Sequence, residues 1–405
     1  METTRLTRHG DDVLQRTLRQ HPRGIGKKLQ EGDCRLMMDR CGRSWLGFAL
    51  MITAITPITA MTNDAAVTVE NAEHVKVFHE KGRFAGWPAN NGIWQWGNEI
   101  LVGFSLGFLA PPEQRGLHQI DPGRPQSLML ARSVDGGETW SLSEAGYPEG
   151  EPKPFPTDIA FDAPGFTLNA RGGRAFISLD RGRTWQGPFR LPFADLHLRA
   201  RTDYHVLGSK DLILFLTAHK TNDREGRPFC ARTRTGGRYW NQLAWIGPEP
   251  PSGYSIMPSS TRMPNGDFLV ALRRRDNDPV EHNFIELFRS RDGGLSWQWL
   301  ANPVEDTGGY SGNPPAMVHL ADGHLCITYA NRNEPRTLRA VFSSNEGVTW
   351  GQEYVLRRGA GEPDIGYTRT VQRPDGKLVT IYYWLDEPRS ERFITATIWS
   401  VPKIN

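Results

Sequence analysis

Cysteine is scarce in this chain of 405 residues. The sequence contains four cysteines, and two of them, Cys34 and Cys41, fall within the segment 1–60. The remaining two, Cys230 and Cys326, are too few and too widely spaced for a cysteine metal motif or a disulfide-rich scaffold. Whether these two thiols pair with each other or stay free and buried is left open by the sequence.

The chain also lacks an excess of charge of either sign over most of its length. The segment 1–60 holds 10 Lys and Arg against 6 Asp and Glu, whereas 61–405 holds 38 against 39. The formal net charge of +3 therefore comes from the N-terminal segment. A balanced chain of this kind gives no indication that nucleic acid or an anionic membrane surface is a partner.

Long hydrophobic runs are absent except for one uncharged stretch at 44–62, which follows two arginines. Basic residues, an apolar run and then small residues are typical of a secretory signal peptide. We therefore expect a signal peptide at 37–60, an over-extended or disordered leader at 1–36, and a secreted or periplasmic protein without stable membrane insertion. A retained signal anchor is the alternative, which Pro57 and the many threonines disfavour.

One short pattern, S-x-D-x-G-x-T-W, recurs along the chain. Its five copies begin at Ser133, Ser178, Thr233, Ser290 and Ser343. The third copy keeps only the glycine and the tryptophan, and the fifth has asparagine in place of aspartate. Aspartate and serine side chains accept backbone N–H bonds in tight turns, and glycine adopts conformations that other residues resist. The near-regular spacing of the five starts indicates a repeat fold.

A second repeat consists of a turn glycine followed by an apolar, β-rich run. Its six glycines are Gly97, Gly165, Gly208, Gly266, Gly323 and Gly376. Short strands between turns, without a convincing amphipathic helix, predict an all-β fold. Six such hairpins with five copies of the first pattern indicate six units, one of which lacks the pattern. We expect the chain termini to meet in that unit, with 75–78 pairing near 393–401, so that no sheet edge stays open.

The five-copy pattern resembles the Asp box of the sialidase superfamily of BNR-repeat β-propellers. The resemblance covers residues 75–401 and implies a six-bladed β-propeller with Asp-box repeats, which fills 61–405 as a single domain. In that family the boxes lie on the outer edge of each blade, away from the substrate. The resemblance therefore implies that Asp135, Asp180 and Asp292 are structural rather than catalytic.

The innermost strands of a propeller line its central channel, and their starts are expected to carry the site residues. Counting back from the turn glycines gives six inner segments, at 87–90, 157–159, 201–204, 257–260, 313–316 and 364–369. Charged groups are costly to bury unless they are paired or used, so their convergence predicts a ligand site. Individual members of the set can instead tie inner strands together.

Sialidases use three arginines that bind the substrate carboxylate, a tyrosine nucleophile paired with a glutamate, and an aspartate that acts as acid and base. The resemblance implies that Tyr367 is the nucleophile and that Asp121 is the acid/base, with His118 beside it as a substrate-binding residue. It also implies that Arg273 and Arg336 bind the carboxylate, with neighbouring arginines as competitors. Guanidinium groups suit this role because they match a carboxylate with two parallel hydrogen bonds.

Two positions depart from the family pattern. The segment 86–88 reads Gly-Trp-Pro where the family has its first arginine, and no glutamate occurs near 257–259 to pair with the tyrosine. The loss of both groups puts sialic acid itself in question as the substrate.

Other polar residues suggest a rearranged site. Asp203 is a second candidate for the acid/base, and Arg201, Tyr204, Arg262 and Asp364 are expected to bind substrate. Such a set suits an acidic or polyhydroxylated sugar.

We expect a secreted, sialidase-like exo-glycoside hydrolase that removes terminal acidic sugars from glycans, with neither a metal nor another cofactor. One alternative is a non-catalytic glycan-binding propeller. Another is a polysaccharide lyase or a different glycosidase, because fold alone does not fix function. A hydrolase needs two carboxylates about 5 to 9.5 Å apart, or a tyrosine–carboxylate pair, whereas a lyase needs a base and a group that neutralises a carboxylate. The sequence leaves the sugar, the linkage, the stereochemical outcome and the oligomeric state open.

Overall fold

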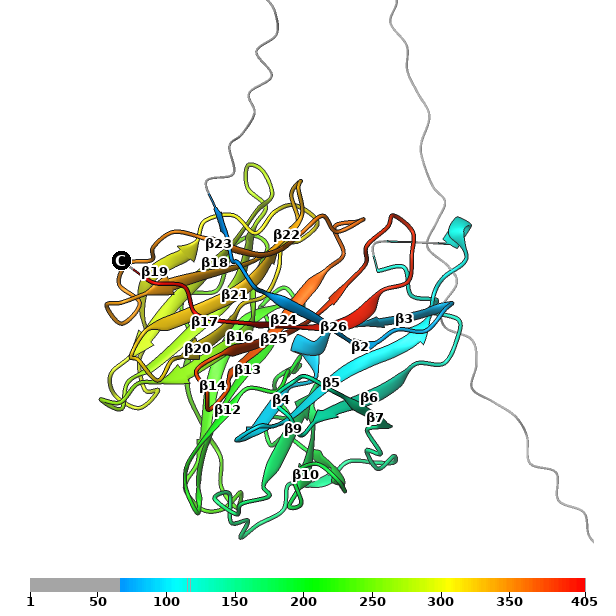
Figure 1. The fold of residues 1–405 in the computed structure, drawn as a ribbon. Coiled ribbons are helices and arrows are strands. Elements are labelled where there is room, and N and C mark those ends of the chain that lie inside the picture. Colours follow the sequence, from blue (N-terminus) through cyan, green and yellow to red (C-terminus); the bar gives the residue numbers. More distant parts are fainter. Residues whose placement is uncertain (1–65, 115, 117, 405) are drawn as a thin grey trace, which may run out of the picture. The chain divides into compact units, whose positions relative to one another are not determined.

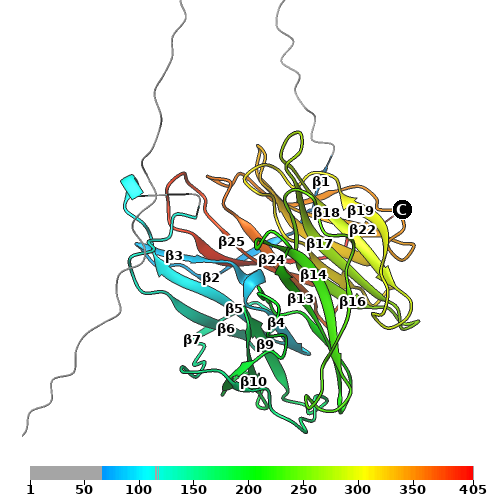
Figure 2. The same ribbon diagram turned by 180° about the vertical axis from the view of Figure 1, so that it is seen from behind.

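The apolar runs after the turn glycines form buried strands in six sheets, which are arranged as a six-bladed β-propeller (Figures 1 and 2). The computed structural model describes residues 66–114, 116 and 118–404, so the expected leader and signal peptide at 1–60 lie outside the described residues. The all-β propeller predicted from the repeats is confirmed. Among the described residues, no helix has the length and apolar character needed to cross a membrane.

The first three blades follow one another along the chain. The strands of the first blade are β3 (Arg83–Gly86), β4 (Ile93–Trp96), β5 (Glu99–Phe108), β6 (Ser127–Ser133) and β7 (Ser141–Glu144). Those of the second are β8 (Lys153–Pro154), β9 (Thr167–Arg171), β10 (Arg174–Ser178) and β11 (Gln186–Arg190). Those of the third are β12 (Tyr204–Gly208), β13 (Asp211–His219), β14 (Glu225–Thr233) and β15 (Asn241–Trp245).

The remaining three blades complete the ring. The strands of the fourth blade are β16 (Tyr254–Arg262), β17 (Phe268–Asp276), β18 (His282–Ser290) and β19 (Gln298–Val304). Those of the fifth are β20 (Ala316–His319), β21 (Leu325–Asn331), β22 (Thr337–Ser343), β23 (Tyr354–Arg358) and β1 (Val67–Thr68). Those of the sixth are β24 (Gly366–Gln372), β25 (Leu378–Trp384), β26 (Phe393–Trp399) and β2 (Glu73–Phe78). Two short 3-10 helices are η1 (Pro88–Asn90) and η2 (Pro112–Gln114).

The sixth blade joins the two ends of the described chain. Strand β2 pairs antiparallel with β26, with Val75 opposite Ala396, and the two strands lie side by side in Figure 1. This blade is also the one without a copy of the repeated pattern. Both expectations for ring closure are therefore confirmed. Strand β2 thus forms the outer edge of the sixth blade and pairs with the edge of β26 that would otherwise be open.

The five repeated patterns form turns, called repeat turns below, that connect neighbouring strands of five blades. In the first of them the Ser133 hydroxyl accepts a hydrogen bond from Gly137 N at 2.7 Å, and Asp135 Oδ1 accepts one from Thr139 N at 2.9 Å. Burial acts to raise the pKa of Asp135, but hydrogen bonds from Thr139 and Ser133 outweigh it and lower this pKa to about 2. In the degenerate copy, Thr235 replaces the aspartate and accepts from Tyr239 N at 2.9 Å.

Strand register places the repeat turns and the start of the channel at opposite ends of the blades. In the fourth blade, β16 begins at Tyr254 opposite Arg275 of β17, which in turn lies opposite Asn283 near the start of β18. The repeat turn follows Ser290, at the far end of β18. We call the end where β16 and β24 begin the mouth, and the other end the turn face.

The second blade departs from the sequence expectation, because 157–159 is not an inner strand. These residues lie instead against the repeat turn of the third blade, where Ile159 N donates to Gly236 O at 3.0 Å and Arg238 contacts Asp158 at 2.9 Å. The adjoining sequence is rich in proline, which cannot donate to a strand ladder. Strand β9 therefore becomes the innermost strand, and the Tyr204 hydroxyl accepts from Leu168 N on its free edge at 3.2 Å.

Both cysteines in the described part of the chain are free and buried. This settles the question that the sequence left open. The Cys230 thiol contacts Gly294 O at 3.2 Å, next to a repeat turn, and burial raises its pKa to about 11. Cys326 lies among apolar side chains of the fifth and sixth blades.

Candidate functional site at the mouth of the channel

Three arginines at the mouth, each from a different blade, lie at or near the end of the strand that follows a turn glycine. Arg171 ends β9, Arg273 lies near the end of β17, and Arg332 directly follows β21. Arg273 and Arg332 are 4% and 3% exposed, so both guanidinium groups are buried and must find partners within the protein.

Tyr367 lies next to two of these arginines. Arg273 Nη1 donates to its hydroxyl at 2.9 Å, and the guanidinium carbon of Arg332 lies 5.8 Å from the centre of its ring. Burial of the phenol opposes ionisation, but the positive charges of Arg273 and Arg332 outweigh this effect and lower the pKa of Tyr367 below its usual value of 10.0. The two guanidinium groups therefore favour the phenolate form of Tyr367.

The backbone at Tyr367 is shaped to present this side chain. Its φ of 51° lies in the left-handed region, and the pairing of β24 with β25 shifts register between Gly366 and Arg369. Asn313 holds the bulge, because its side chain accepts from Tyr367 N at 3.0 Å and donates to Ile365 O at 2.7 Å. Strained backbone of this kind persists where the surroundings over-determine it and is concentrated at functional sites.

Asp364 forms the centre of a second network beside Tyr367. Its Oδ1 accepts from the Tyr383 hydroxyl, and it lies 3.5 Å from Arg332 Nη2 and 3.4 Å from His118 Nδ1. Burial acts to raise the pKa of this carboxyl, but the hydrogen bond to His118 and the charge of Arg332 lower it overall. Asp364 thus remains ionised although it is 1% exposed.

His118 connects this buried network to the solvent. Its side chain is 45% exposed, and its ring packs edge-on against Trp87 with the ring centres 5.4 Å apart. The contact with Asp364 orients the imidazole and fixes which nitrogen faces the carboxylate. Around Tyr367, the mouth therefore combines two of its three arginines, one phenol and one carboxylate-bound imidazole.

Position 86 explains why the mouth has no arginine from the first blade. A Cβ atom built on Gly86 would lie 2.8 Å from the ring of Phe84 and 3.4 Å from that of Tyr383. A larger residue would therefore have to displace the ring of Phe84, which packs against Trp87 with the ring centres 4.9 Å apart. The following residue, Trp87, has a left-handed φ of 60° and covers the mouth beside His118.

A cavity of about 280 Å³ lies in the channel, around Asp203. The Ser260 hydroxyl donates to Asp203 Oδ1 at 2.9 Å and lies 3.0 Å from His205 Nε2. Burial raises the pKa of Asp203 to about 7, against the opposing charge of Arg369. Burial also lowers the pKa of His205 to about 4, so this group is neutral at physiological pH.

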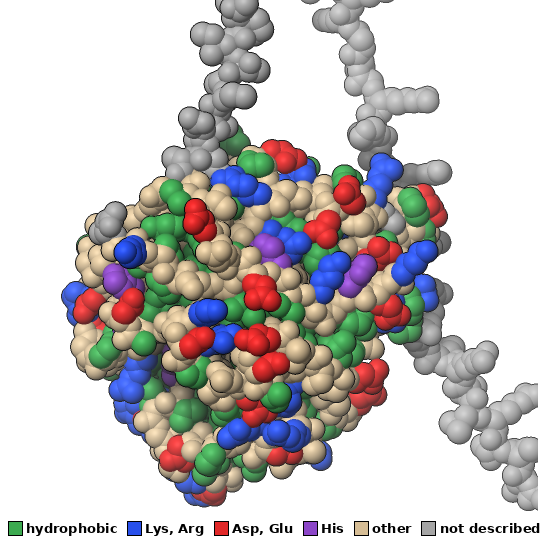
Figure 3. Space-filling view, viewed as in Figure 1, with side chains coloured by type: hydrophobic (Ala, Val, Ile, Leu, Met, Phe, Trp, Pro, Cys, Tyr) green, Lys and Arg blue, Asp and Glu red, His purple; other side chains and the backbone are tan. Residues whose placement is uncertain are grey.

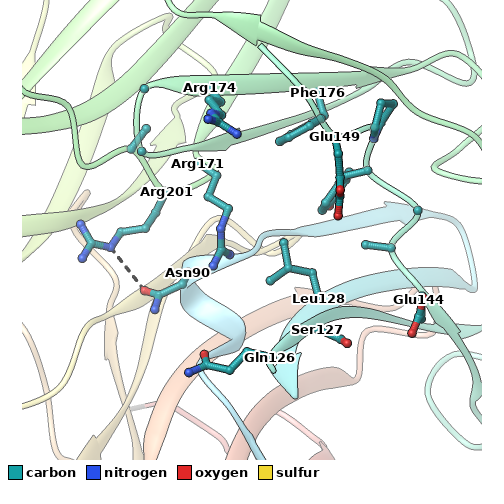
Figure 4. Close-up of a pocket in the computed structure, with 18 of the residues that line it drawn as sticks. Asn90, Gln126, Ser127, Leu128, Glu144, Glu149, Arg171, Arg174, Phe176 and Arg201 are labelled. Carbon is teal, nitrogen blue, oxygen red and sulfur yellow. Dashed lines mark hydrogen bonds between the residues drawn. The ribbon is translucent and has the colours of Figure 1, made fainter. Parts of the chain in front are cut away.

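A larger cleft of about 1050 Å³ opens between the first two blades (Figure 4). Arg171, Arg201 and Asn90 stand together on one side of it, and Glu144 and Glu149 stand on the other. Arg171 Nη1 donates to the side chain of Asn91 at 2.7 Å, and Arg201 Nε donates to Asn90 Oδ1 at 3.3 Å. The missing inner strand of the second blade leaves room for this cleft, which reaches the mouth at Asn90.

The structure brings together four of the residues singled out in the sequence: Tyr367, Arg273, His118 and Asp364. Arg201 lies in the cleft and pairs with Glu225. Asp203 and Tyr204 line the cavity in the channel. Tyr204 also supports β9, and burial raises its pKa to about 12.

Three other expected residues lie apart from this group. Asp121 closes a turn in the loop before β6, where its Oδ1 accepts from Gly123 N at 2.9 Å. Arg262 is exposed at the end of β16 that is remote from the mouth. Arg336 is directed away from Tyr367, because its Nη1 donates to Ala360 O at 3.2 Å and to Gly361 O at 3.1 Å.

Sequence reasoning missed Arg332 and Arg171. Both lie where the apolar strand after a turn glycine ends, as Arg273 does in the fourth blade. An arginine at the end of such a run is the signal that would have found them. That signal becomes visible only when the strand ends of different blades are aligned with one another.

The fold and the mouth define a class, a six-bladed β-propeller with a cationic, tyrosine-bearing site at one end of its channel. The chain belongs to the family described as BNR repeat-like domain, which matches residues 162–380. No curated protein matches the chain.

Three solved structures illustrate the likeness. A protein of unknown function from Dyadobacter fermentans DSM 18053 has a TM-score of 0.62 and 19% identity, over 82% of this chain and 100% of that one. An alpha-L-arabinanase from Penicillium chrysogenum, complexed with arabinobiose, has a TM-score of 0.51 and 13% identity, over 81% and 97%. A Trypanosoma rangeli sialidase in complex with the inhibitor DANA has a TM-score of 0.51 and 11% identity, over 82% of this chain and 60% of that one. At these identities the likeness shows the fold, and it agrees with the sialidase-like resemblance seen in the sequence.

Proposed function

We propose that the protein is a glycoside hydrolase that removes acidic sugars from glycan chains, with Tyr367 as the nucleophile. The observation that carries this proposal is the hydrogen bond of 2.9 Å from Arg273 to the Tyr367 hydroxyl, together with the Arg332 guanidinium 5.8 Å from the centre of the ring. Guanidinium groups favour the phenolate, and they also favour a sugar that bears a carboxylate.

The proposed reaction has two steps. The Tyr367 phenolate attacks the anomeric carbon through Oη, the glycosidic bond breaks, and the leaving oxygen takes a proton from the protonated imidazole of His118, which Asp364 orients. Water then gives a proton to His118 and attacks the same carbon, which releases the sugar and Tyr367. Two displacements at one centre retain the anomeric configuration. The sequence expectation that Asp121 or Asp203 is the acid/base remains a competing prediction.

The cleft between the first two blades suits the remainder of the substrate. Its volume of about 1050 Å³ slightly exceeds the range of about 300 to 1,000 Å³ typical of small-ligand sites. We propose that a terminal sugar occupies the mouth while the rest of the glycan follows the cleft past Asn90 and Arg201. The proposal includes export of the protein, which rests on the signal peptide expected at 37–60.

A lyase is the second candidate, and one observation favours it. Among the residues that the structure describes, no carboxylate forms a hydrogen bond with the Tyr367 hydroxyl. A phenolate without a carboxylate partner can remove the proton next to a uronate carboxylate that arginines have neutralised. Elimination would then give an unsaturated sugar instead of a hydrolysed one.

The test is turnover of aryl sialosides, uronic-acid glycosides and uronate-containing oligosaccharides by the purified protein. Tyr367→Phe should lower kcat/KM on the active substrate by at least about 10³-fold. The matched control is Tyr239→Phe, an exposed tyrosine on a repeat turn, which should leave turnover unchanged.

The products separate the candidates. A reducing sugar without ultraviolet absorbance supports the hydrolase, and an absorbing unsaturated product supports the lyase. Glycan binding without turnover of any substrate would contradict both and favour a binding propeller. His118→Gln and Asp121→Asn, compared on the active substrate, decide which residue is the acid/base.

A further inference from the structure

Two histidines and an aspartate converge on the third blade, outside the mouth and the channel. His197 precedes β12, His219 ends β13, and Asp223 lies in the turn between β13 and β14. His197 Nδ1 lies 2.7 Å and His219 Nδ1 lies 3.0 Å from the same carboxylate oxygen, Asp223 Oδ1. One ligand atom from each of the three residues fits within 4.8 Å of the others.

Backbone hydrogen bonds hold the two histidines in place. His219 N donates to His197 O at 2.9 Å, and Arg199 N donates to Thr217 O at 2.7 Å. These bonds flank an antiparallel bridge between Leu198 and Ala218, so the two imidazoles are neighbours across a short ladder. Their rings meet edge to face, with centres 5.3 Å apart. The imidazole positions are therefore set by the main chain.

The aspartate is fixed in a similar way. Asp223 N donates to Lys220 O at 3.0 Å, and Lys220 N donates to Arg224 O at 2.8 Å, which closes the turn. Asp223 has a left-handed φ of 58°, a conformation that aspartate tolerates better than most residues. The hydrogen bonds from His219 and His197 lower the pKa of Asp223, so its carboxylate is ready to act as an anionic ligand.

We propose that His197, His219 and Asp223 form a binding site for a divalent transition-metal ion of the zinc type. Imidazole and carboxylate are ligands that zinc shares with its neighbours in the periodic table, whereas calcium and magnesium prefer oxygen alone. At bond lengths of about 2.0 to 2.2 Å, tetrahedral zinc ligands stand roughly 3.3 Å apart, close to the distances between Nδ1 and Oδ1. The exposure of His197 and Asp223 leaves a fourth position for water or a further ligand.

One neighbouring group competes with the ion. Arg199 Nε lies 3.3 Å from His219 Nε2, the nitrogen opposite the proposed ligand atom. When Nδ1 binds a metal, Nε2 carries a hydrogen and no longer accepts, so the exposed Arg199 side chain must turn away. Arg199 also lines the cleft, so the ion would fix the segment that leads to Arg201.

The test is isothermal titration of the full-length protein with Zn²⁺, supported by the visible spectrum of bound Co²⁺. The reference is a variant in which His197, His219 and Asp223 are changed to Ala, Ala and Asn, because the segment 1–60 contains other histidines and cysteines. We expect the wild type to bind one more equivalent than this reference. His197→Ala or His219→Ala alone should weaken binding at that site by at least about tenfold.

The matched control is His282→Ala, an exposed histidine that contacts Glu305 O at 2.7 Å and should leave Zn²⁺ binding unchanged. Zn²⁺ should also raise the Tm of the wild type more than that of the reference, whereas Ca²⁺ should not distinguish them. Equal Zn²⁺ stoichiometry in the wild type and the reference would overturn the proposal. If His219→Ala does not fold, His197→Ala decides alone, because its side chain is 69% exposed.

Discussion

The turn face and the mouth hold their polar side chains in opposite ways. On the turn face, Ser133 accepts from Gly137, only four residues away. At the mouth, the hydrogen bond from Arg273 to Tyr367 joins residues 94 positions apart. The serine and aspartate side chains of the repeat turns therefore stabilise one turn each, whereas the contacts of Arg273 and Arg332 at the mouth join different blades and bury charge. Figure 3 shows acidic and basic side chains interspersed over the surface in that view.

The largest effect is expected when an arginine of the mouth is removed. Arg332→Ala leaves Asp364 with one cationic partner fewer, and the loss of a buried ion-pair partner costs about 3 to 5 kcal/mol. Activity should fall as well, because Tyr367 loses one of its two cations. The measurements are urea unfolding and kcat/KM. Arg336→Ala is the matched control, and an equal loss in that variant would refute the assignment of Arg332 to the site.

A smaller effect, on stability alone, is expected at the turn face. Asp135→Ala should cost about 1 to 2 kcal/mol, because it removes the acceptor for the turn, and kcat/KM should stay the same. The folded pKa of about 2 lies below the usual value of 3.8, so this stabilisation is present above about pH 4 and disappears as the pH falls to about 2. The exposed Asp162→Ala is the control for unfolding at each pH. A loss of activity in Asp135→Ala would contradict the prediction that the turn face contributes to stability alone.

An intermediate effect is expected in the channel, where Asp203→Asn tests the role of the buried carboxyl group. The pKa of Asp203 is raised to about 7, so the folded protein binds a proton that the unfolded chain releases, and stability falls as the pH rises from about 4 through 7. Asp203→Asn should remove this dependence and gain on the order of 1 kcal/mol at pH 8. We expect turnover to persist. A loss of about 10²-fold would instead support Asp203 as the general acid or base.

The smallest effect is expected from Asn345→Asp in the fifth blade. Asn345 Oδ1 already accepts from Thr349 N at 2.9 Å, and its amide donates to Thr349 Oγ1 at 2.8 Å. A carboxylate would strengthen the backbone bond and reverse the direction of the side-chain bond, for a gain of about 0.5 to 1 kcal/mol. Thermal unfolding at pH 7 measures it, and the gain should vanish near pH 2.

These differences explain how much could be predicted from the sequence. Short sequence patterns and their spacing predict the repeat turns, the number of blades and the ring closure. Tyr367 and Arg273 were predicted from the resemblance to sialidases, because Tyr367 lies at the start of the last inner segment and Arg273 closes an apolar strand. These features therefore required no knowledge of how distant segments meet.

The remaining features depend on where strands end and on which neighbours they meet. Arg332 reaches the mouth and Arg336 does not, because β21 ends at Asn331, opposite Thr337 of β22, and the turn between them directs the two arginines apart. The missing inner strand of the second blade follows from prolines and from contacts with the third blade. The positions of the two arginines are set by register across a sheet, and the place of 157–159 is set partly by contacts with another blade, so local patterns alone predict neither.

The central claim is that two buried guanidinium groups hold Tyr367 ready to ionise. Ultraviolet difference titration measures this directly and needs no substrate: the tyrosinate signal of the wild type is compared with that of Tyr367→Phe. We expect the lost signal to titrate below the usual pKa of 10.0 and to move upward in Arg273→Gln, but not in the control Arg274→Gln. A Tyr367 signal that titrates above 10, or that ignores Arg273, would contradict this claim.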